Sequence, residues 1–142
     1  MIDRRAFLAL ACAGFSSPRV SAAQSPATSA RIGLVSPFSP SDAASWHDAF
    51  RLGLRELGWT EGTNIRIDYR YAHGRDERLP ALIAELARLN VQIIVTSVTE
   101  DALVAKKVTT TIPIVMAAAG DPVATGIVDS LARPGGNLTG LS

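Results

Sequence analysis

The sequence predicts an α/β domain built on a parallel sheet with helices on both faces. Short apolar runs alternate with segments whose apolar residues recur at helical spacing, from Arg31 to the end of the chain. Short turns rich in glycine, proline and aspartate separate them. The length of 142 residues suits one domain with a real core. We therefore expect strand–helix units closed by a last strand, about five strands in all.

The first unit begins with a strand at Ile32 to Ser36 (IGLVS), followed by a loop rich in serine and proline. A helix is expected next, because Trp46, Phe50, Gly53, Leu54 and Leu57 recur at helical spacing. That spacing predicts Trp46 and Phe50 as core residues rather than ligand contacts. Gly58 is expected to end the helix.

The second unit begins with a strand in which Ile65, Ile67, Tyr69 and Tyr71 alternate with charged residues, a pattern typical of a sheet edge. Asp76 is expected to cap the following helix, with Pro80 in its first turn. The buried side of that helix is predicted to comprise Leu79, Leu82, Ile83, Leu86 and Leu89. His73 is expected to be a solvated loop residue.

The third strand, Val91 to Thr96 (VQIIVT), is more uniformly apolar, as a central strand should be. Thr99 is expected to cap the next helix. Glu100 and Asp101 place acidic charge in its first turn, which complements the positive end of the helix dipole.

The last units centre on the segment Thr111 to Val123 (TIPIVMAAAGDPV). Its apolar run predicts a buried strand, and small residues then lead to Asp121 as N-cap and Pro122 as the first helical residue. That helix is expected to reach Arg133, and Asn137 to Gly140 (NLTG) predicts a short fifth strand.

Residues 1–23 have the three-part plan of a bacterial secretory signal. Arg4 and Arg5 precede an apolar run that is too short to span a membrane. A segment of small residues of the kind found at cleavage sites follows at residues 20–23. The segment Asp3 to Leu8 (DRRAFL) resembles the twin-arginine export motif, so both export routes stay open. Cys12 gives only a poor match to a lipobox, so lipid anchoring is the weaker alternative. Residues 24–30 (QSPATSA) are predicted as a linker.

Composition and motifs exclude several functions. The formal net charge of +1 without a basic stripe argues against nucleic-acid binding. Two separated histidines and one cysteine argue against a metal cluster or a thiol nucleophile. Dinucleotide, nucleotide triphosphate and hydrolase motifs are missing. A flavin loop at Ser36 to Ser41 is disfavoured because its prolines lack N–H donors. We expect no cofactor and no catalytic residues.

The candidate site lies at the carboxyl ends of the predicted strands, where open α/β sheets bind their ligands. Small polar groups gather there, namely Ser36, Ser97, Thr99, Gly120 and Asp121. Free N–H groups at the starts of the helices after Thr99 and Asp121 could bind a carboxylate or another anion. Asp121 is explained by capping alone, and the alternative is that it also receives a ligand amine.

Five segments together resemble the bacterial ABC-transporter substrate-binding proteins, in the branch that includes tryptophan- and tyrosine-type binding proteins. They are Phe50 to Gly62 (FRLGLRELGWTEG), Asn64 to Tyr69 (NIRIDY), Arg78 to Leu89 (RLPALIAELARL), Ile112 to Pro122 (IPIVMAAAGDP) and Leu131 to Ser142 (LARPGGNLTGLS). The resemblance covers residues 31–142, and the combination of Gly-Asp-Pro with Pro-Gly-Gly-Asn-x-Thr-Gly is its most specific part.

The resemblance implies a type I periplasmic-binding fold of two flavodoxin-like lobes that close on a small organic, amino-acid-like solute and deliver it to an inner-membrane ABC permease. Matching positions imply that the ligand-facing residues are Ser36, Pro37, Phe38, Ser97, Val98, Thr99, Gly120, Asp121 and Pro122. Family members continue into a second lobe, so residues 31–142 are expected to be an amino-terminal lobe, apparently truncated.

Two other interpretations stay open. One is an enzyme or signalling domain on the same flavodoxin-like scaffold. A receiver domain would need clustered acids at the end of the first strand, where this chain has Ser36 and Pro37. The other is a truncated remnant without function. Because fold does not fix function, periplasmic solute binding rests on the resemblance and on the missing catalytic motifs.

Overall fold

The chain folds around a parallel sheet of five strands in the order β2-β1-β3-β4-β5. The computed structural model describes residues 29–117 and 136–140. The strands are β1 (Ala30–Ser36), β2 (Ile65–Tyr71), β3 (Ile93–Thr96), β4 (Ile114–Met116) and β5 (Leu138–Gly140). This strand order is that of flavodoxin-like folds, so the expected fold class is confirmed.

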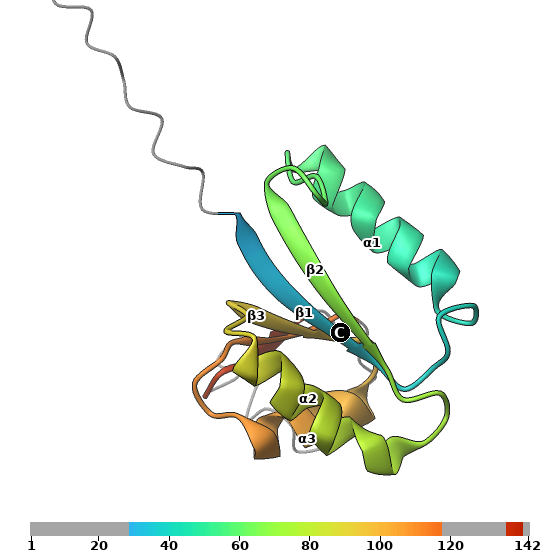
Figure 1. Cartoon of the computed structure of the whole chain (residues 1–142), viewed down its shortest axis with the longest axis vertical. Coiled ribbons are helices and arrows are strands. Elements are labelled where there is room, and N and C mark those ends of the chain that lie inside the picture. The colour runs from blue at the N-terminus through green and yellow to red at the C-terminus, as the bar shows by residue number, and fades with distance from the viewer. Residues whose placement is uncertain (1–28, 118–135, 141–142) are drawn as a thin grey trace, which may run out of the picture.

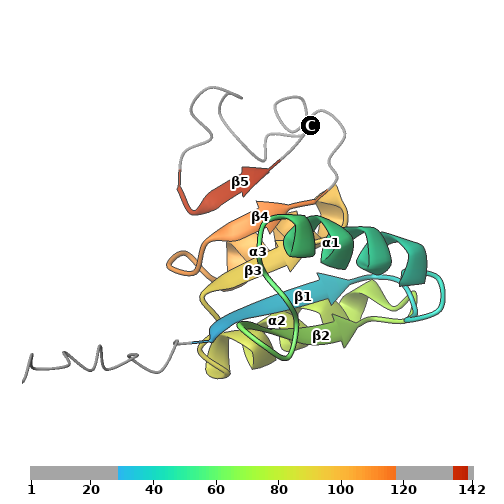
Figure 2. The same cartoon turned by 90° about the horizontal axis from the view of Figure 1, so that it is seen from above.

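Helices cover both faces of the sheet, as predicted. The helices are α1 (Ala44–Glu56), the short 3-10 helix η1 (Asp76–Arg78), α2 (Leu79–Arg88) and α3 (Thr99–Val108). Figures 1 and 2 show α1 on one face and α2 with α3 on the other. Right-handed crossovers explain this split, because the chain moves from β1 to β2 in one direction and from β2 through β3 to β4 in the other.

Each face has its own apolar core. Under α2 and α3 the core includes Leu79, Ile83, Leu86, Ile94 and Ile114, all fully buried. On the other face, Phe50 and Leu54 of α1 pack on a cluster of β1, β2 and β3 residues that includes Leu34 and Val95. The predicted inner face of α2 is therefore confirmed, with Leu89 only partly buried.

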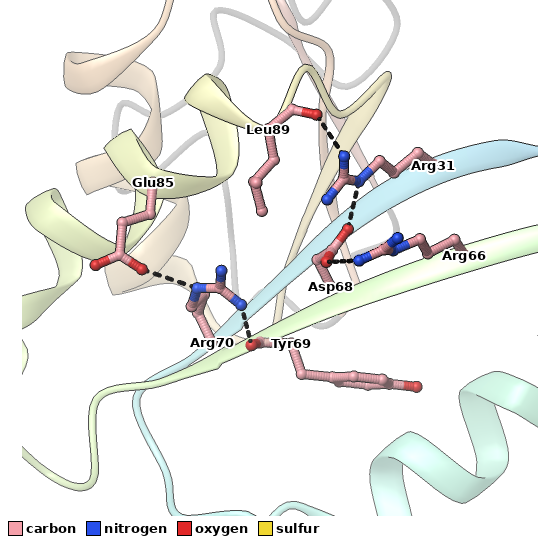
Figure 3. A network of polar contacts seen from close by, with 7 residues as sticks. All are labelled: Arg31, Arg66, Asp68, Tyr69, Arg70, Glu85 and Leu89. Atoms are coloured by element: carbon pink, nitrogen blue, oxygen red, sulfur yellow. Dashed lines mark hydrogen bonds and ion pairs between the residues drawn. The ribbon is translucent and has the colours of Figure 1, made fainter.

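A polar network fastens the edge strand β2 to its neighbours (Figure 3). Asp68 accepts hydrogen bonds from Arg31 Nε at 2.6 Å and from Arg66 at 3.5 Å, and Arg31 also donates to the carbonyl of Leu89 at 3.0 Å. Arg70 reaches Glu85 of α2 at 2.9 Å. The charged residues that alternate along β2 therefore tie the predicted edge strand to β1 and to the α2 segment.

Several local expectations were wrong. Trp46 is 51% exposed, because α1 turns His47, Phe50 and Leu54 toward β1 and β2 and leaves Trp46 beside β3 and β4. Leu57, predicted to share the buried side of this helix, is 78% exposed.

The predicted helix caps also differ from the structure. Asp76 begins η1 and caps no helix. Thr99 is the first residue of α3, with Val98 at the N-cap position, and the side chain that accepts backbone N–H groups at this helix start is Asp101, from Ser97 and Val98. β3 begins two residues later than expected, at Ile93.

Other expectations lie outside the described residues. They concern the leader at residues 1–23, most of the linker at residues 24–30, and the turn and helix from Gly120 to Arg133. Within residues 29–117 and 136–140, no helix has the length and apolar character needed to cross a membrane.

Candidate functional site

A groove of about 580 Å³ lies between α1 and the carboxyl ends of β3 and β4. We call it the α1 groove. Its wall on α1 and its floor on the strands are mostly apolar, and its lining comprises Leu34, Ser45, Trp46, His47, Ala49, Phe50, Val95, Ser97, Val115, Met116 and Ala117. A concave, largely apolar surface with a few polar groups is the usual form of a small-molecule site.

The α1 groove lies beside the topological switch point of the sheet, which falls between β1 and β3. From β1 the chain passes to α1 on one face, and from the adjacent β3 it passes to α3 on the other (Figure 2). Ser97 Oγ donates to the carbonyl of Val35 at 3.3 Å and so links the ends of these two strands. Open α/β sheets bind ligands at such a point, because the diverging connections leave a crevice there.

The structure gathers only part of the predicted site. Ser97 lines the α1 groove, and Phe38, 41% exposed, lies edge-on to the groove residue Trp46 with ring centroids 6.3 Å apart. Ser36 is fully buried, and its Oγ accepts a hydrogen bond from the Phe38 N–H at 3.3 Å. Pro37 is half-buried between them.

The remaining predicted residues are not brought to the groove. Val98 and Thr99 are half-buried at the start of α3 and do not line it. Gly120, Asp121 and Pro122 lie outside the described residues. The structure therefore places Ser97 and Phe38 at or near the α1 groove, and Ser36 and Pro37 do not line it.

The amides at the start of α3 already have an acceptor within the chain. Asp101 Oδ2 accepts the N–H of Ser97 and Oδ1 that of Val98, each at 2.9 Å. Its carboxyl group is fully buried, and this burial raises its pKa to about 7 against the opposing effect of the N–H donors. The N–H groups of Ser97 and Val98 are therefore satisfied within the chain, and anion binding at the helix start after Thr99 stays a prediction.

His47 is a polar group of the groove that the sequence analysis did not single out. It is 5% exposed, and its Nδ1 lies 3.1 Å from the hydroxyl of Tyr71. Its Nε2 is buried with no hydrogen-bond partner among the described residues. A buried polar atom left unpaired costs about 1–3 kcal/mol. Its position near the start of the helix that follows the first strand was the available signal.

Acid should destabilise the fold through His47. Burial is the main cause that lowers the pKa of His47 below its ordinary value of 6.5, with Arg51 adding to the effect and Asp48 opposing it. The unfolded chain therefore binds the proton more tightly, so the contribution to stability is complete above about pH 6.5 and is lost as the pH falls further.

This prediction is measured as the urea unfolding free energy of the wild type minus that of His47→Gln, between pH 8 and pH 5. The difference isolates His47 from Asp101, whose raised pKa acts in the opposite direction over part of this range. His73→Gln is the matched control, because His73 is exposed. A difference that stays constant with pH would contradict the prediction.

The described residues contain no cluster of three or more His, Cys, Asp or Glu side chains that could hold a metal ion. The polar side chains that line the α1 groove are instead the hydroxyl groups of Ser45 and Ser97 and the imidazole of His47. These groups can orient a small molecule through hydrogen bonds.

Comparison with known families decides the class of protein. The family model described as "ABC transporter substrate binding protein" matches residues 32–142, most of the chain. The chain belongs to the ABC transporter substrate-binding protein family. This is a family of solute-binding proteins and not of enzymes, and its members are generally extracytoplasmic and work with a small-molecule ligand and a permease. The resemblance inferred from the sequence is confirmed.

Individual relatives agree with this membership. The chain is 34% identical over 93 residues to a protein named "Tyrosine-binding protein" from Clostridioides difficile, a match that covers 66% of this chain and 27% of the relative. A solved structure of a conserved domain protein from Vibrio cholerae matches with a TM-score of 0.74 and 30% identity. A second solved structure, of an ABC domain in complex with L-Trp from Streptococcus pneumonia, matches with a TM-score of 0.73 and 27% identity.

Both structural matches cover 80% of this chain and 38% of the solved chain. The chain therefore spans between about a quarter and two fifths of the length of these relatives.

Proposed function

We propose that this chain provides the amino-terminal wall of a solute site in a binding protein of an ABC importer. The observation that carries the proposal is the α1 groove, which lies at the carboxyl ends of β3 and β4, beside the switch point between β1 and β3. The proposed ligand is a small, amino-acid-like organic solute. The names of two relatives, one tyrosine-binding and one solved with L-Trp, support that class.

The proposed ligand-facing residues combine the sequence expectation with the groove. Ser97 and Phe38 provide a hydroxyl and an aromatic ring from the loops after β3 and β1, and Trp46 provides a second ring from α1. Ser36, Pro37, Val98 and Thr99 support these loops, and Gly120, Asp121 and Pro122 remain proposed contacts. A second lobe would cover the ligand from the opposite side and complete an interlobe cleft.

The proposed cellular role follows from the family and the leader. Residues 1–23 would direct export by the general or the twin-arginine route, and residues 24–30 would join them to the lobe at residues 31–142. The chain would then act in the periplasm and present its solute to an inner-membrane permease. A lipid anchor at Cys12 is the less favoured alternative.

Truncation of Trp46 should weaken ligand binding without destabilising the fold. Trp46 is 51% exposed and lines the α1 groove, so Trp46→Ala removes ligand contact and little core packing. Loss of a central aromatic contact costs more than about 1 kcal/mol, so we expect the dissociation constant for L-tryptophan to rise about tenfold. Isothermal titration calorimetry measures this constant, and thermal unfolding checks the fold.

The chain offers a matched control in its other tryptophan. Trp59 is 41% exposed and lies away from the α1 groove, in a small pocket near the end of α1. Trp59→Ala should leave the dissociation constant within about twofold of the wild type. Equal losses of affinity in the two variants would contradict the proposal that the α1 groove holds the solute.

A further inference from the structure

The α1 groove has no charged side chain among the described residues that line it. Its walls are mostly apolar, and its polar side chains are those of two serines and His47. Burial lowers the pKa of His47 below its ordinary value of 6.5, so the imidazole is neutral at pH 7.5. The lining of the groove therefore offers no ion-pair partner to a charged solute.

Charged residues on the neighbouring elements have their partners away from the groove. On α1, Arg51 pairs with Asp48 and donates to the hydroxyl of Tyr69 in β2 at 3.2 Å. After β3, the carboxyl group of Asp101 accepts the backbone N–H groups of Ser97 and the next residue. None of these three charged side chains lines the α1 groove.

Hydrogen-bond donors at the ends of β3 and β4 are also occupied within the chain. The Ser97 N–H donates to Asp101 at 2.9 Å, and the Ser97 hydroxyl donates to the Val35 carbonyl at 3.3 Å. The Ala117 N–H donates to the Thr96 carbonyl at 2.9 Å. A carboxylate placed on this floor would lose its water without gaining these donors. Because burial of an unpaired charge is strongly unfavourable, the charged groups of a solute are excluded from the floor.

An aromatic ring suits the same surface. Phe50 and Val95 line the groove and belong to the apolar cluster of this face of the sheet. Trp46 is 51% exposed in the groove wall, and its ring lies edge-on to that of Phe38 with centroids 6.3 Å apart. A ring bound against Trp46 and Val115 would remove apolar surface from water and could adopt the offset or edge-on contacts that aromatic rings favour.

We propose that the α1 groove binds an uncharged aromatic end of the solute, and that the charged groups of the solute lie outside the groove. The inference rests on the proposed function and narrows its ligand to solutes with an aromatic end. Ala49, an exposed small residue of α1, lines the groove and leaves room for this end.

Three related probes separate the two ends of such a solute. Indole has no charge, indole-3-acetate has its carboxylate on the side chain, and indole-5-carboxylate has it on the ring. Isothermal titration calorimetry on the purified chain at pH 7.5 measures the three dissociation constants. We expect indole-3-acetate to bind within about fivefold of indole, because a charge that stays in water contributes little. Indole-5-carboxylate should bind at least about tenfold more weakly than indole-3-acetate, because its charge would be buried with the ring.

A filling substitution tests whether the ring occupies the groove. Ala49→Phe places a bulky side chain in the groove, so it should weaken indole and L-tryptophan by the same factor, at least about tenfold. Leu52→Phe is the matched control, because Leu52 is a 50% exposed residue of α1 that does not line the groove. It should leave both dissociation constants within about twofold of the wild type. Thermal unfolding checks the fold of each variant.

The outcomes separate this inference from the proposed function. Equal affinities for indole-3-acetate and indole-5-carboxylate, or an Ala49→Phe variant that loses L-tryptophan and keeps indole, would refute the inference and leave the proposed function standing. Should Ala49→Phe fail to fold, amide chemical shifts of the wild type decide, since indole must shift the same groove amides as L-tryptophan. Failure of every amino acid tested to bind, with or without binding of indole, would refute the proposed function and this inference with it.

Discussion

Leu86→Ala is expected to lower the free energy of unfolding by about 2–5 kcal/mol. Leu86 is fully buried in the core between α2 and the sheet. A Cβ added at Gly33 of β1 would lie 2.8 Å from Leu86 Cδ1 and 2.9 Å from Cδ2. Leu86 therefore occupies the space that a side chain at Gly33 would fill, and its truncation leaves a cavity against β1. Urea denaturation measures the loss.

A double-mutant cycle tests whether this contact sets the spacing between helix and sheet. Gly33→Ala alone should cost about 1–3 kcal/mol, because Leu86 must move within a filled core. In the double variant the new methyl group partly fills the cavity, so the combined loss should be less than the sum of the two. Losses that add within about 0.5 kcal/mol would contradict this explanation. Leu52→Ala, at a site 50% exposed, should change stability by less than about 0.5 kcal/mol.

Asp101→Ala is expected to cost about 2–4 kcal/mol, because the variant loses a helix cap worth about 0.5–2 kcal/mol and leaves a buried N–H unpaired at about 1–3 kcal/mol. The two amides concerned are those of Ser97 and Val98, each 2.9 Å from the carboxylate. Since Ser97 lines the α1 groove, the same substitution should also loosen its rim. Thermal and urea unfolding measure the stability.

The matched control is Asp101→Asn, which keeps one carbonyl oxygen and should lose roughly half as much stability. The comparison also has a pH signature. Because burial raises the pKa of Asp101 from 3.8 to about 7, the folded state holds the proton more tightly than the unfolded state. The wild type should therefore gain stability relative to Asp101→Asn as the pH falls from 7 toward 4. A loss below about 0.5 kcal/mol in Asp101→Ala would show that the carboxylate does not hold this turn.

The fold could be predicted from the sequence because local patterns and topology agree. Alternation in β2 indicated an edge strand, and β2 is an edge strand. Uniform apolar character in β3 indicated a central strand, and β3 lies between β1 and β4. The right-handed crossover rule then allows few arrangements of these units.

The site was harder to predict because its lining depends on how α1 lies over the sheet. Helical periodicity identifies an apolar stripe but not which side of the stripe meets another element. Trp46 belongs to the stripe of α1 and nevertheless faces the groove, whereas His47, a polar residue, lies in the buried layer. The prediction of the α3 cap failed for a related reason. Both Thr99 and Asp101 can accept hydrogen bonds from backbone N–H groups, and only the path of the loop selects Asp101.

Amide chemical-shift mapping with L-tryptophan on the purified chain tests the central claim most directly, namely that the α1 groove is the solute site. We expect saturable shifts confined to the groove, at Ser45 and Ala49 on α1, at Ser97 after β3, and at Val115 and Ala117 on and after β4. Shifts centred on the small pocket around Arg55 and Trp59, or no saturable shifts for any amino acid tested, would contradict it.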